Sequence, residues 1–215
     1  MILKADSIEL ILDNKSILKN IYIDLSIGKI TCLLGRNGSG KSSLFNVIFG
    51  ITKPRHKHIK FEDKIIQKAL YKTKSITYLP QRFLVPNHLT PINAFKLYNL
   101  QWVNFTNHFP ELDRFKSTKF KKLSGGERRL IEIYLCLKKE SKIVILDEPF
   151  AYLSPIYIEK ITPFILEEKK HKGILISDHN FRPLLKISDC VYFINHGSIK
   201  KITSNDALEE LNYFI

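Results

Sequence analysis

The chain has 215 residues, of which 44% are hydrophobic, and it carries a formal net charge of +13. A chain of this length and composition can bury one good core, so we expect one domain, or one domain with an inserted lobe. The charged start, MILKADSIEL, excludes a signal peptide, and no apolar run approaches the length of a membrane span. We therefore expect a cytosolic protein, or one that touches a membrane only through a partner.

Short apolar runs alternate with helical patterns along the chain, which is typical of an α/β protein. Strand patterns stop between residues 86 and 120, where aromatic residues and asparagine become common, and this change indicates a small inserted helical lobe. The predicted strands lie at 7–12, 20–27, 29–35, 75–81, 142–147, 173–178 and 190–195. The predicted helices outside the first part of the lobe lie at 41–50, 127–139 and 155–170.

The segment LLGRNGSGKSSL follows a predicted strand and opens a predicted helix. Within it, residues 35–42 fit the pattern G-x-x-x-x-G-K-[ST], whose glycines let successive backbone N–H groups point at phosphate oxygens. Lys41 is expected to reach the β- and γ-phosphates of a nucleotide, and the hydroxyl of Ser42 to bind Mg²⁺. The residues predicted to bind the nucleotide in this loop are Gly35, Asn37, Gly38, Ser39, Gly40, Lys41, Ser42 and Ser43.

A second motif, IVILDE, ends a strand without polar alternation, so we expect this strand to be buried on both faces. Asp147 would hold Mg²⁺ through water, and Glu148 could polarise the water that attacks the γ-phosphorus. On its own, the pair would be an ordinary strand-ending Asp-Glu. Because the carboxyl ends of neighbouring parallel strands lie together in α/β folds, we expect it beside the phosphate loop.

A third motif, LSGGE, opens a predicted helix and offers another anion site. It combines a side-chain hydroxyl, exposed backbone N–H groups and the positive end of a helix. Two phosphate sites far apart in one chain suggest a head-to-tail dimer. In such a dimer, the second site of each chain would close over the ATP that the first loop of the other chain holds.

In this order along the chain, the motifs resemble the ATP-binding cassette family, and the resemblance covers essentially the whole chain. The phosphate loop, LSGGE and IVILDE are similar to the Walker A, signature and Walker B sequences of that family. LSGGERR, LDEPFA and ILISDHNFR look like the cassettes of lipopolysaccharide-export systems and branched-chain amino-acid importers. The resemblance implies an α/β fold in one domain, 1–215, with a P-loop NTPase core on a mixed sheet, an N-terminal antiparallel β part and a small helical subdomain inserted at about 86–138.

The resemblance also implies roles for individual residues. Gln81, in YLPQ, matches the glutamine that contacts Mg²⁺ and the attacking water, and His179, in ISDHN, matches the switch histidine that bonds the γ-phosphate. The implied catalytic residues are Glu148, His179 and Gln81, and the implied metal ligands are Ser42, Gln81 and Asp147. The residues expected to contact the nucleotide of the other chain are Ser124, Gly125, Gly126 and Glu127.

The chain departs from the family pattern at two positions. Leu12 stands where the family places an aromatic ring against adenine, and an aliphatic contact would be weaker by about 1 kcal/mol. Ser154 stands where the family has an aspartate that helps the two subunits communicate. Ser154 precedes Pro155 and suits a helix N-cap, so the cap is expected to survive while the charge is lost.

The leading interpretation is an ATPase that uses ATP and Mg²⁺, works as a homodimer and drives transmembrane permease subunits. Such a protein would be cytoplasmic and peripheral on the inner face of the membrane. Phe83, Leu84, Val85 and Trp102 are candidates for a groove that receives a permease helix, although the same residues would also suit packing inside the lobe.

Two other functions compete with transport. A soluble cassette ATPase acting on nucleic acid, ribosomes or iron–sulfur assembly would suit the basic charge, but the chain has neither a second cassette nor a long coiled-coil insertion, so nucleic acid is disfavoured. A module that senses ATP without turnover is disfavoured by the intact Lys41, Glu148 and His179.

The lysines also occur in scattered pairs, which indicates compositional bias as much as a binding surface. Three cysteines, Cys32, Cys136 and Cys190, lack metal-site spacing and are expected to be free thiols.

Overall fold

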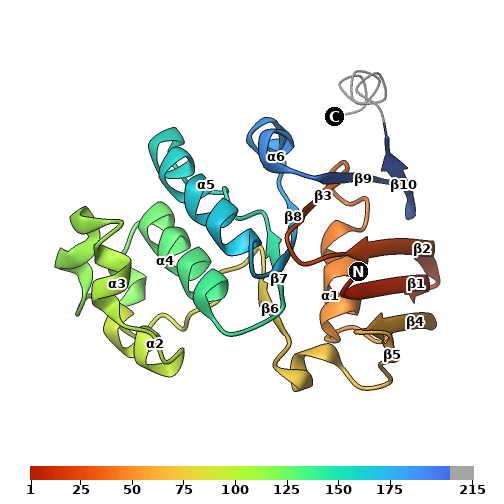
Figure 1. Ribbon diagram of the computed structural model, residues 1–215, viewed down its shortest axis with the longest axis horizontal. Coiled ribbons are helices and arrows are strands. Elements are labelled where there is room, and N and C mark those ends of the chain that lie inside the picture. The colour runs from red at the N-terminus through yellow and green to blue at the C-terminus, as the bar shows by residue number, and fades with distance from the viewer. Residues whose placement is uncertain (204–215) are drawn as a thin grey trace.

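The computed structural model describes residues 1–203, which form two sheets with helices between and beside them (Figure 1). The antiparallel sheet has the strand order β2 (Lys15–Leu25), β1 (Leu3–Leu12), β4 (His56–Phe61) and β5 (Lys64–Ile65). The central sheet has the strand order β10 (Ser198–Ile202), β9 (Cys190–Asn195), β3 (Ile30–Leu34), β8 (Gly173–Ser177), β7 (Ile143–Asp147) and β6 (Ile76–Leu79). Its pairs are parallel except β9 with β10, so the sheet is mixed, as the family resemblance implied.

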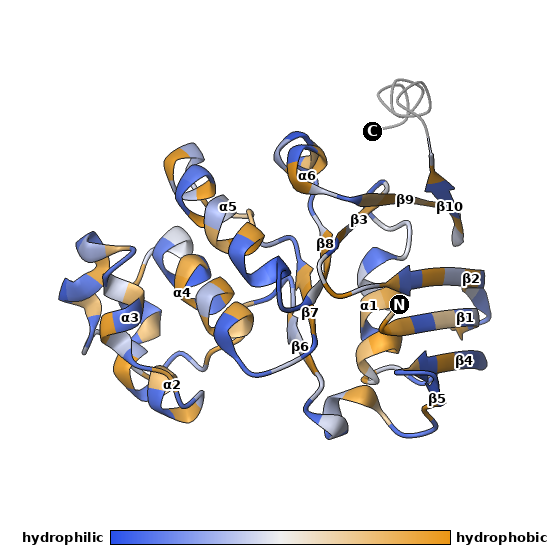
Figure 2. Cartoon of the chain, viewed as in Figure 1, coloured by the Kyte–Doolittle hydropathy of each residue, from blue (hydrophilic) through white to orange (hydrophobic). Residues whose placement is uncertain are grey.

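The central strands are buried on both faces, which explains their unbroken apolar sequences (Figure 2). Along β7, Ile143 and Ile145 pack into one core, while Val144 and Leu146 pack into another. We call the first the sandwich core, because it lies between the two sheets and contains α1 (Lys41–Phe49). We call the second the helical core, because it contains α4 (Gly125–Lys138), α5 (Pro155–Lys169) and α6 (Phe181–Ile187).

A helical insert leaves the central sheet after β6 and returns to it at β7 (Figure 1). It comprises α2 (Pro91–Leu97), α3 (Trp102–Thr106), the short 3₁₀ turns η2 (Pro110–Phe115) and η3 (Phe120–Lys122), and α4. Aromatic rings hold it together: Phe95 and Phe105 pack against Tyr134 of α4, and Trp102 packs against both of these phenylalanines. A further 3₁₀ turn, η1 (Leu70–Thr73), precedes β6.

The predicted elements agree with the structure in kind and order, and their ends differ by a few residues. The first two strands are longer than predicted and flank a turn at Asp13 and Asn14, both of which have positive φ. Gly50 caps α1 at its carboxyl end. The domain bounds 1–215 and the bounds of the helical insert, 86–138, stay predictions. Residues 204–215 lie outside the described part of the chain.

Ser154 occupies the N-cap position of α5 and Pro155 the first helical position, but the serine side chain makes no capping hydrogen bond. Within residues 1–203, none of the helices has the length and apolarity needed to cross a membrane.

Candidate functional site

The phosphate loop joins the end of β3 to the start of α1, as its sequence predicted. Gly38 has a φ of +79°, which a residue with a side chain rarely adopts. A Cβ on Gly35 would lie 2.4 Å from the carbonyl oxygen of Ile194, so only glycine fits there. The loop can therefore curl tightly in front of the first turn of α1, whose N–H groups have no intrahelical acceptors.

Two polar side chains of the loop, those of Lys41 and Ser39, could bind an anion. The ammonium of Lys41 is buried and donates to the carbonyl oxygens of Gly35 and Arg36, at 2.7 and 3.0 Å. Burial lowers the pKa of Lys41, while the negative charges of Glu148 and Asp147 raise it. Among the described residues, the buried hydroxyl of Ser39 has no hydrogen-bond partner. The loop thus contains a buried cation and a hydroxyl without a hydrogen-bond partner.

The acidic pair lies at the carboxyl end of β7, near this loop. Asp147 accepts hydrogen bonds from the hydroxyls of Tyr78 and Ser177, both at 3.1 Å. Burial raises the pKa of Asp147, and the hydroxyls of Ser42, Tyr78 and Ser177 oppose that rise. Ser42, in the first turn of α1, therefore lies close to the acidic pair.

Glu148 has two polar neighbours from adjacent strands. Gln81 follows β6 and donates from Nε2 to Oε2 of Glu148, at 2.9 Å. His179 follows β8, and its Nδ1 lies 3.9 Å from the same carboxylate oxygen and 3.4 Å from Asp178 Oδ1. Because β6, β7 and β8 are parallel neighbours, their carboxyl ends bring together three residues that are far apart in sequence.

The LSGGE turn is the start of α4. Ser124 Oγ accepts the N–H of Glu127 at 3.2 Å, and the Glu127 carboxylate accepts the N–H of Ser124 at 2.8 Å, which is a complete capping box. A hollow of about 380 Å³ opens beside it, lined by Ser124, Gly125, Gly126, Tyr152, Ser154 and Tyr157. The phosphate loop and His179 line a different cavity, so within this chain the two anion sites are separate.

Comparison with known proteins identifies this arrangement. The family model described as "ABC transporter" matches residues 18–151, which include the phosphate loop, the Ser124 turn and the acidic pair. The chain belongs to the ABC transporter family. It is the ATP-binding subunit of such a transporter.

Curated relatives of this ABC subunit cover most of its length. The "Lipopolysaccharide export system ATP-binding protein LptB" of Acidithiobacillus ferridurans is 28% identical over 92% of this chain and 88% of the relative. The "Probable branched-chain amino acid transport ATP-binding protein LivF" of Archaeoglobus fulgidus is 32% identical over 90% of this chain and 88% of the relative. The subgroup that LSGGERR and ILISDHNFR suggested is therefore found among the relatives.

Solved structures agree with the fold. The crystal structure of the ADP conformation of MJ1267, an ATP-binding cassette of an ABC transporter, is 25% identical over 97% of this chain and 93% of its own, with a TM-score of 0.78. The structure of another ABC transporter ATP-binding subunit has a TM-score of 0.84 at 22% identity, over 100% of this chain and 95% of its own. The predicted fold class is confirmed.

Two features of this ABC subunit lie where a base or a partner could bind. A hollow of about 520 Å³ faces the phosphate loop and is lined partly by Ile17 and Phe193; Leu12, the predicted adenine contact, is exposed and is not among its lining residues. A second hollow is lined by Phe83, Leu84, Val85, Pro86, Asn87 and Arg128.

For Trp102 the structure favours the second alternative, packing inside the lobe, over a place in the groove. Its ring is buried in the helical insert, and its Nε1 donates to Asp113 at 2.8 Å. An aromatic residue in a loosely patterned helical segment looks like a docking residue when the partner rings that bury it are unknown.

Sequence reasoning missed several residues that hold the predicted ones. Tyr78 and Ser177 fix Asp147, and Asp178 accepts the backbone N–H groups of Phe150 and Asn180, at 2.8 and 3.0 Å. Tyr78 could have been found, because it is a polar-tipped ring in a buried parallel strand and needs a partner there. Arg129, which contacts the backbone of the acidic pair, left no comparable signal, because it is followed by ordinary helix sequence.

Proposed function

We propose that this ABC subunit hydrolyses ATP, as a head-to-tail homodimer with two nucleotides at its interface. The observation that carries the proposal is the meeting of Gln81, Glu148 and His179 beside the phosphate loop, with Gln81 hydrogen-bonded to Glu148. A protein that only senses ATP would not need a carboxylate with such partners at this place.

The phosphates would be held by the loop from Gly35 to Ser43. Lys41 would exchange its carbonyl partners for phosphate oxygens, and the unpaired hydroxyl of Ser39 would gain an acceptor or donor. Asn37, Gly38 and Gly40 would leave their backbone groups open to the ligand. We assign Ile17 and Phe193, which line the hollow that faces the phosphate loop, to the neighbourhood of the base, with Leu12 outside that hollow.

Mg²⁺ would fit the oxygen atoms of Ser42, Asp147 and Gln81, because hard cations prefer hydroxyl, carboxylate and amide oxygens. Support comes from the closeness of Ser42 to Asp147, whose pKa the Ser42 hydroxyl lowers. When bound, the ion would neutralise negative charge on the β- and γ-phosphates. Tyr78 and Ser177 would keep Asp147 pointed at it.

Glu148 would act on the attacking water. Its carboxylate would accept a hydrogen bond from the water, and Gln81 would hold both in line. His179 is largely exposed, so it is free to turn from Glu148 toward the γ-phosphate. Ser124, Gly125, Gly126 and Glu127 would contact the nucleotide of the other chain, with the capping box keeping the turn in shape.

We further propose that transmembrane permease subunits recruit the protein to the cytoplasmic face of the membrane. The hollow beside Phe83 is the best candidate for their docking, because it lies next to the segment that carries Gln81. The names of the relatives make a lipid or amino-acid cargo plausible for their own systems, but the cargo site would belong to the permease, not to this chain.

Phosphate release from MgATP tests the proposal. The wild-type chain should turn over, and Glu148→Gln should bind ATP but release phosphate at least about 100 times more slowly. With ATP and Mg²⁺, Glu148→Gln should elute as a dimer in light scattering, alone or with its permease. A Glu148→Gln chain that stays monomeric both alone and with its permease would refute the head-to-tail dimer. Equal turnover by Glu148→Gln and the wild type would refute the role of Glu148.

A further inference from the structure

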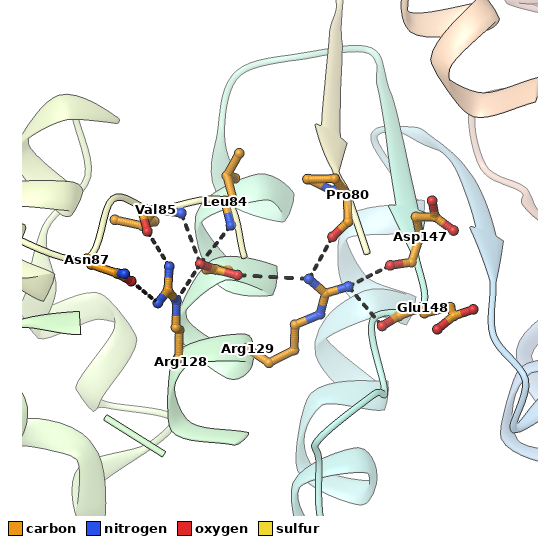
Figure 3. A network of polar contacts seen from close by, with 9 residues as sticks. Pro80, Leu84, Val85, Asn87, Arg128, Arg129, Asp147 and Glu148 are labelled. Atoms are coloured by element: carbon orange, nitrogen blue, oxygen red, sulfur yellow. Dashed lines mark hydrogen bonds and ion pairs between the residues drawn. The ribbon is translucent and has the colours of Figure 1, made fainter. Parts of the chain in front are cut away.

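Three charged side chains of α4 are buried together: Arg128, Arg129 and Glu132 (Figure 3). Their spacing of three and four residues places them on neighbouring turns of the helix. Arg129 and Glu132 are both 0% exposed. Buried charges are costly unless they are paired and hydrogen-bonded, so the contacts of these groups indicate why they are there.

Arg129 donates to the backbone at the ends of two strands. Its Nη1 lies 2.8 Å from the carbonyl oxygen of Pro80, and its Nη2 lies 2.5 and 2.8 Å from those of Asp147 and Glu148. Figure 3 shows the guanidinium between Pro80 on one side and the acidic pair on the other.

These contacts begin where the pairing of β6 with β7 stops. That pairing ends at Leu79 opposite Leu146, and Arg129 bonds the carbonyl groups of the next residue after Leu79, Pro80, and of the next two residues after Leu146, Asp147 and Glu148. Gln81 follows Pro80 directly, and Glu148 has a φ of +50°, an uncommon conformation for a residue other than glycine. Arg129 thus links the ends of β6 and β7 just beyond the last residues at which these two strands pair with each other.

Glu132 ties the segment after Gln81 to the same helix. Its Oε1 accepts the N–H groups of Leu84 and Val85, at 2.9 and 3.0 Å, and Nε of Arg128 at 3.1 Å. Its other oxygen lies 3.9 Å from Nη1 of Arg129. The segment that carries Gln81 is therefore held to α4 at both ends.

We propose that Arg129 is a positioning residue for hydrolysis, which fixes Gln81 and Glu148 relative to each other and to the helix that begins at the Ser124 turn. The inference rests on the proposed ATPase function. A buried arginine that served stability alone could be replaced by a well-packed apolar residue, often at no cost. Arg129 instead donates hydrogen bonds to the backbone carbonyl groups of Pro80, Asp147 and Glu148. These carbonyl groups lie at or next to Gln81 and Glu148, the two residues that would bind the attacking water.

The test compares Arg129→Met, Arg129→Lys and Lys138→Met. Methionine removes all donors at similar length, whereas lysine keeps the charge and fewer donors. Lys138 lies on the same helix and pairs with Glu168 at 2.7 Å, away from the acidic pair, so Lys138→Met controls for loss of a charged contact. ATP affinity, thermal stability and kcat are measured for each.

Arg129→Met should lower kcat about 100-fold, the cost of a small misplacement of reacting groups, with the Kd for ATP changed less than about threefold. Arg129→Lys should recover part of kcat, and Lys138→Met should keep kcat unchanged. Arg129 variants with unchanged kcat, or with kcat and ATP affinity lost in parallel, overturn the positioning role.

A double-mutant cycle keeps the proposal testable if Arg129→Met does not fold. Since Arg129 acts through Gln81 and Glu148, the effect of Arg129→Lys on kcat should shrink at least about threefold in a Gln81→Ala background. Additive effects overturn the inference while leaving the ATPase proposal intact. A wild-type chain without turnover overturns the ATPase proposal, and the positioning role with it.

Discussion

At the scale of single residues, the carboxylate of Asp147 shows how the site is built at a cost in stability. Burial raises its pKa, so the folded protein binds a proton there more readily than the unfolded chain does. Stability therefore falls as pH rises from the ordinary carboxyl pKa, about 3.9, through the higher pKa of the folded state. Above that window, the folded protein carries an ionised group that burial disfavours.

Replacing that carboxylate should stabilise the nucleotide-free protein. We expect Asp147→Asn to raise the free energy of unfolding at pH 7 by about 1 kcal/mol, since the amide keeps an acceptor for Tyr78 or Ser177 without the buried charge. Urea unfolding from pH 7 toward pH 4 should show that the difference in free energy of unfolding between Asp147→Asn and the wild type becomes smaller. Asp63→Asn, on the exposed surface, makes the same charge change as a control. A difference that stays constant with pH would contradict this account.

At the scale of elements, the start of α4 packs closely against the loop after β7. A Cβ on Gly125 would meet the side chain of Tyr152 at 3.3 Å, and a Cβ on Gly126 would lie 2.7 Å from the carbonyl oxygen of Tyr152. Tyr152 has a φ of +69°, and its ring packs on Phe83 with centroids 5.5 Å apart. Gly125 therefore faces the side chain of Tyr152, and Gly126 faces its backbone.

Because of this difference, replacing Tyr152 by glycine should change the effect of Gly125→Ala on stability but leave the effect of Gly126→Ala unchanged. Gly126→Ala should destabilise the protein by about 1–3 kcal/mol whether residue 152 is Tyr or Gly, because the carbonyl oxygen remains. Gly125→Ala should destabilise the wild type, but in a Tyr152→Gly background it should stabilise by up to about 1 kcal/mol, the helix preference for alanine. Urea unfolding of the wild type, the three single variants and the two double variants measures both effects. An equal cost for Gly125→Ala in both backgrounds would show that Tyr152 is not the obstacle.

Elements and motif positions could be predicted because each depends on local sequence. The apolar strand before Gly35, the helix after Lys41 and the acidic end of β7 all have short-range patterns, and parallel topology then brings Gln81, Glu148 and His179 together. The burial of Trp102 and the hydrogen bonds of Arg129 depend on side chains from distant segments. A buried ion network has no sequence period, so it could not be anticipated from α4 alone.

At the scale of the whole molecule, the proposed nucleotide site joins two cores that share the central sheet. Lys41 belongs to α1, whose apolar residues fill the sandwich core. Glu148 follows β7, and the segment carrying Gln81 is tied to α4 of the helical core. A nucleotide held by Lys41 and by the acidic pair would bridge elements of both cores.

Nucleotide should therefore raise the stability of both cores together. At an ATP concentration of 100 times Kd, binding adds about 2.7 kcal/mol, which corresponds to about 5–10 °C in Tm for a chain of this size. We expect Glu148→Gln with MgATP to show this shift in calorimetry as a single transition, and chelation of Mg²⁺ to reduce it. Lys41→Met should unfold at the same temperature with and without MgATP, because the phosphates lose their cation, whereas Lys138→Met should still respond. Two separate transitions, only one of them moved by ATP, would mean that the ligand engages one core alone.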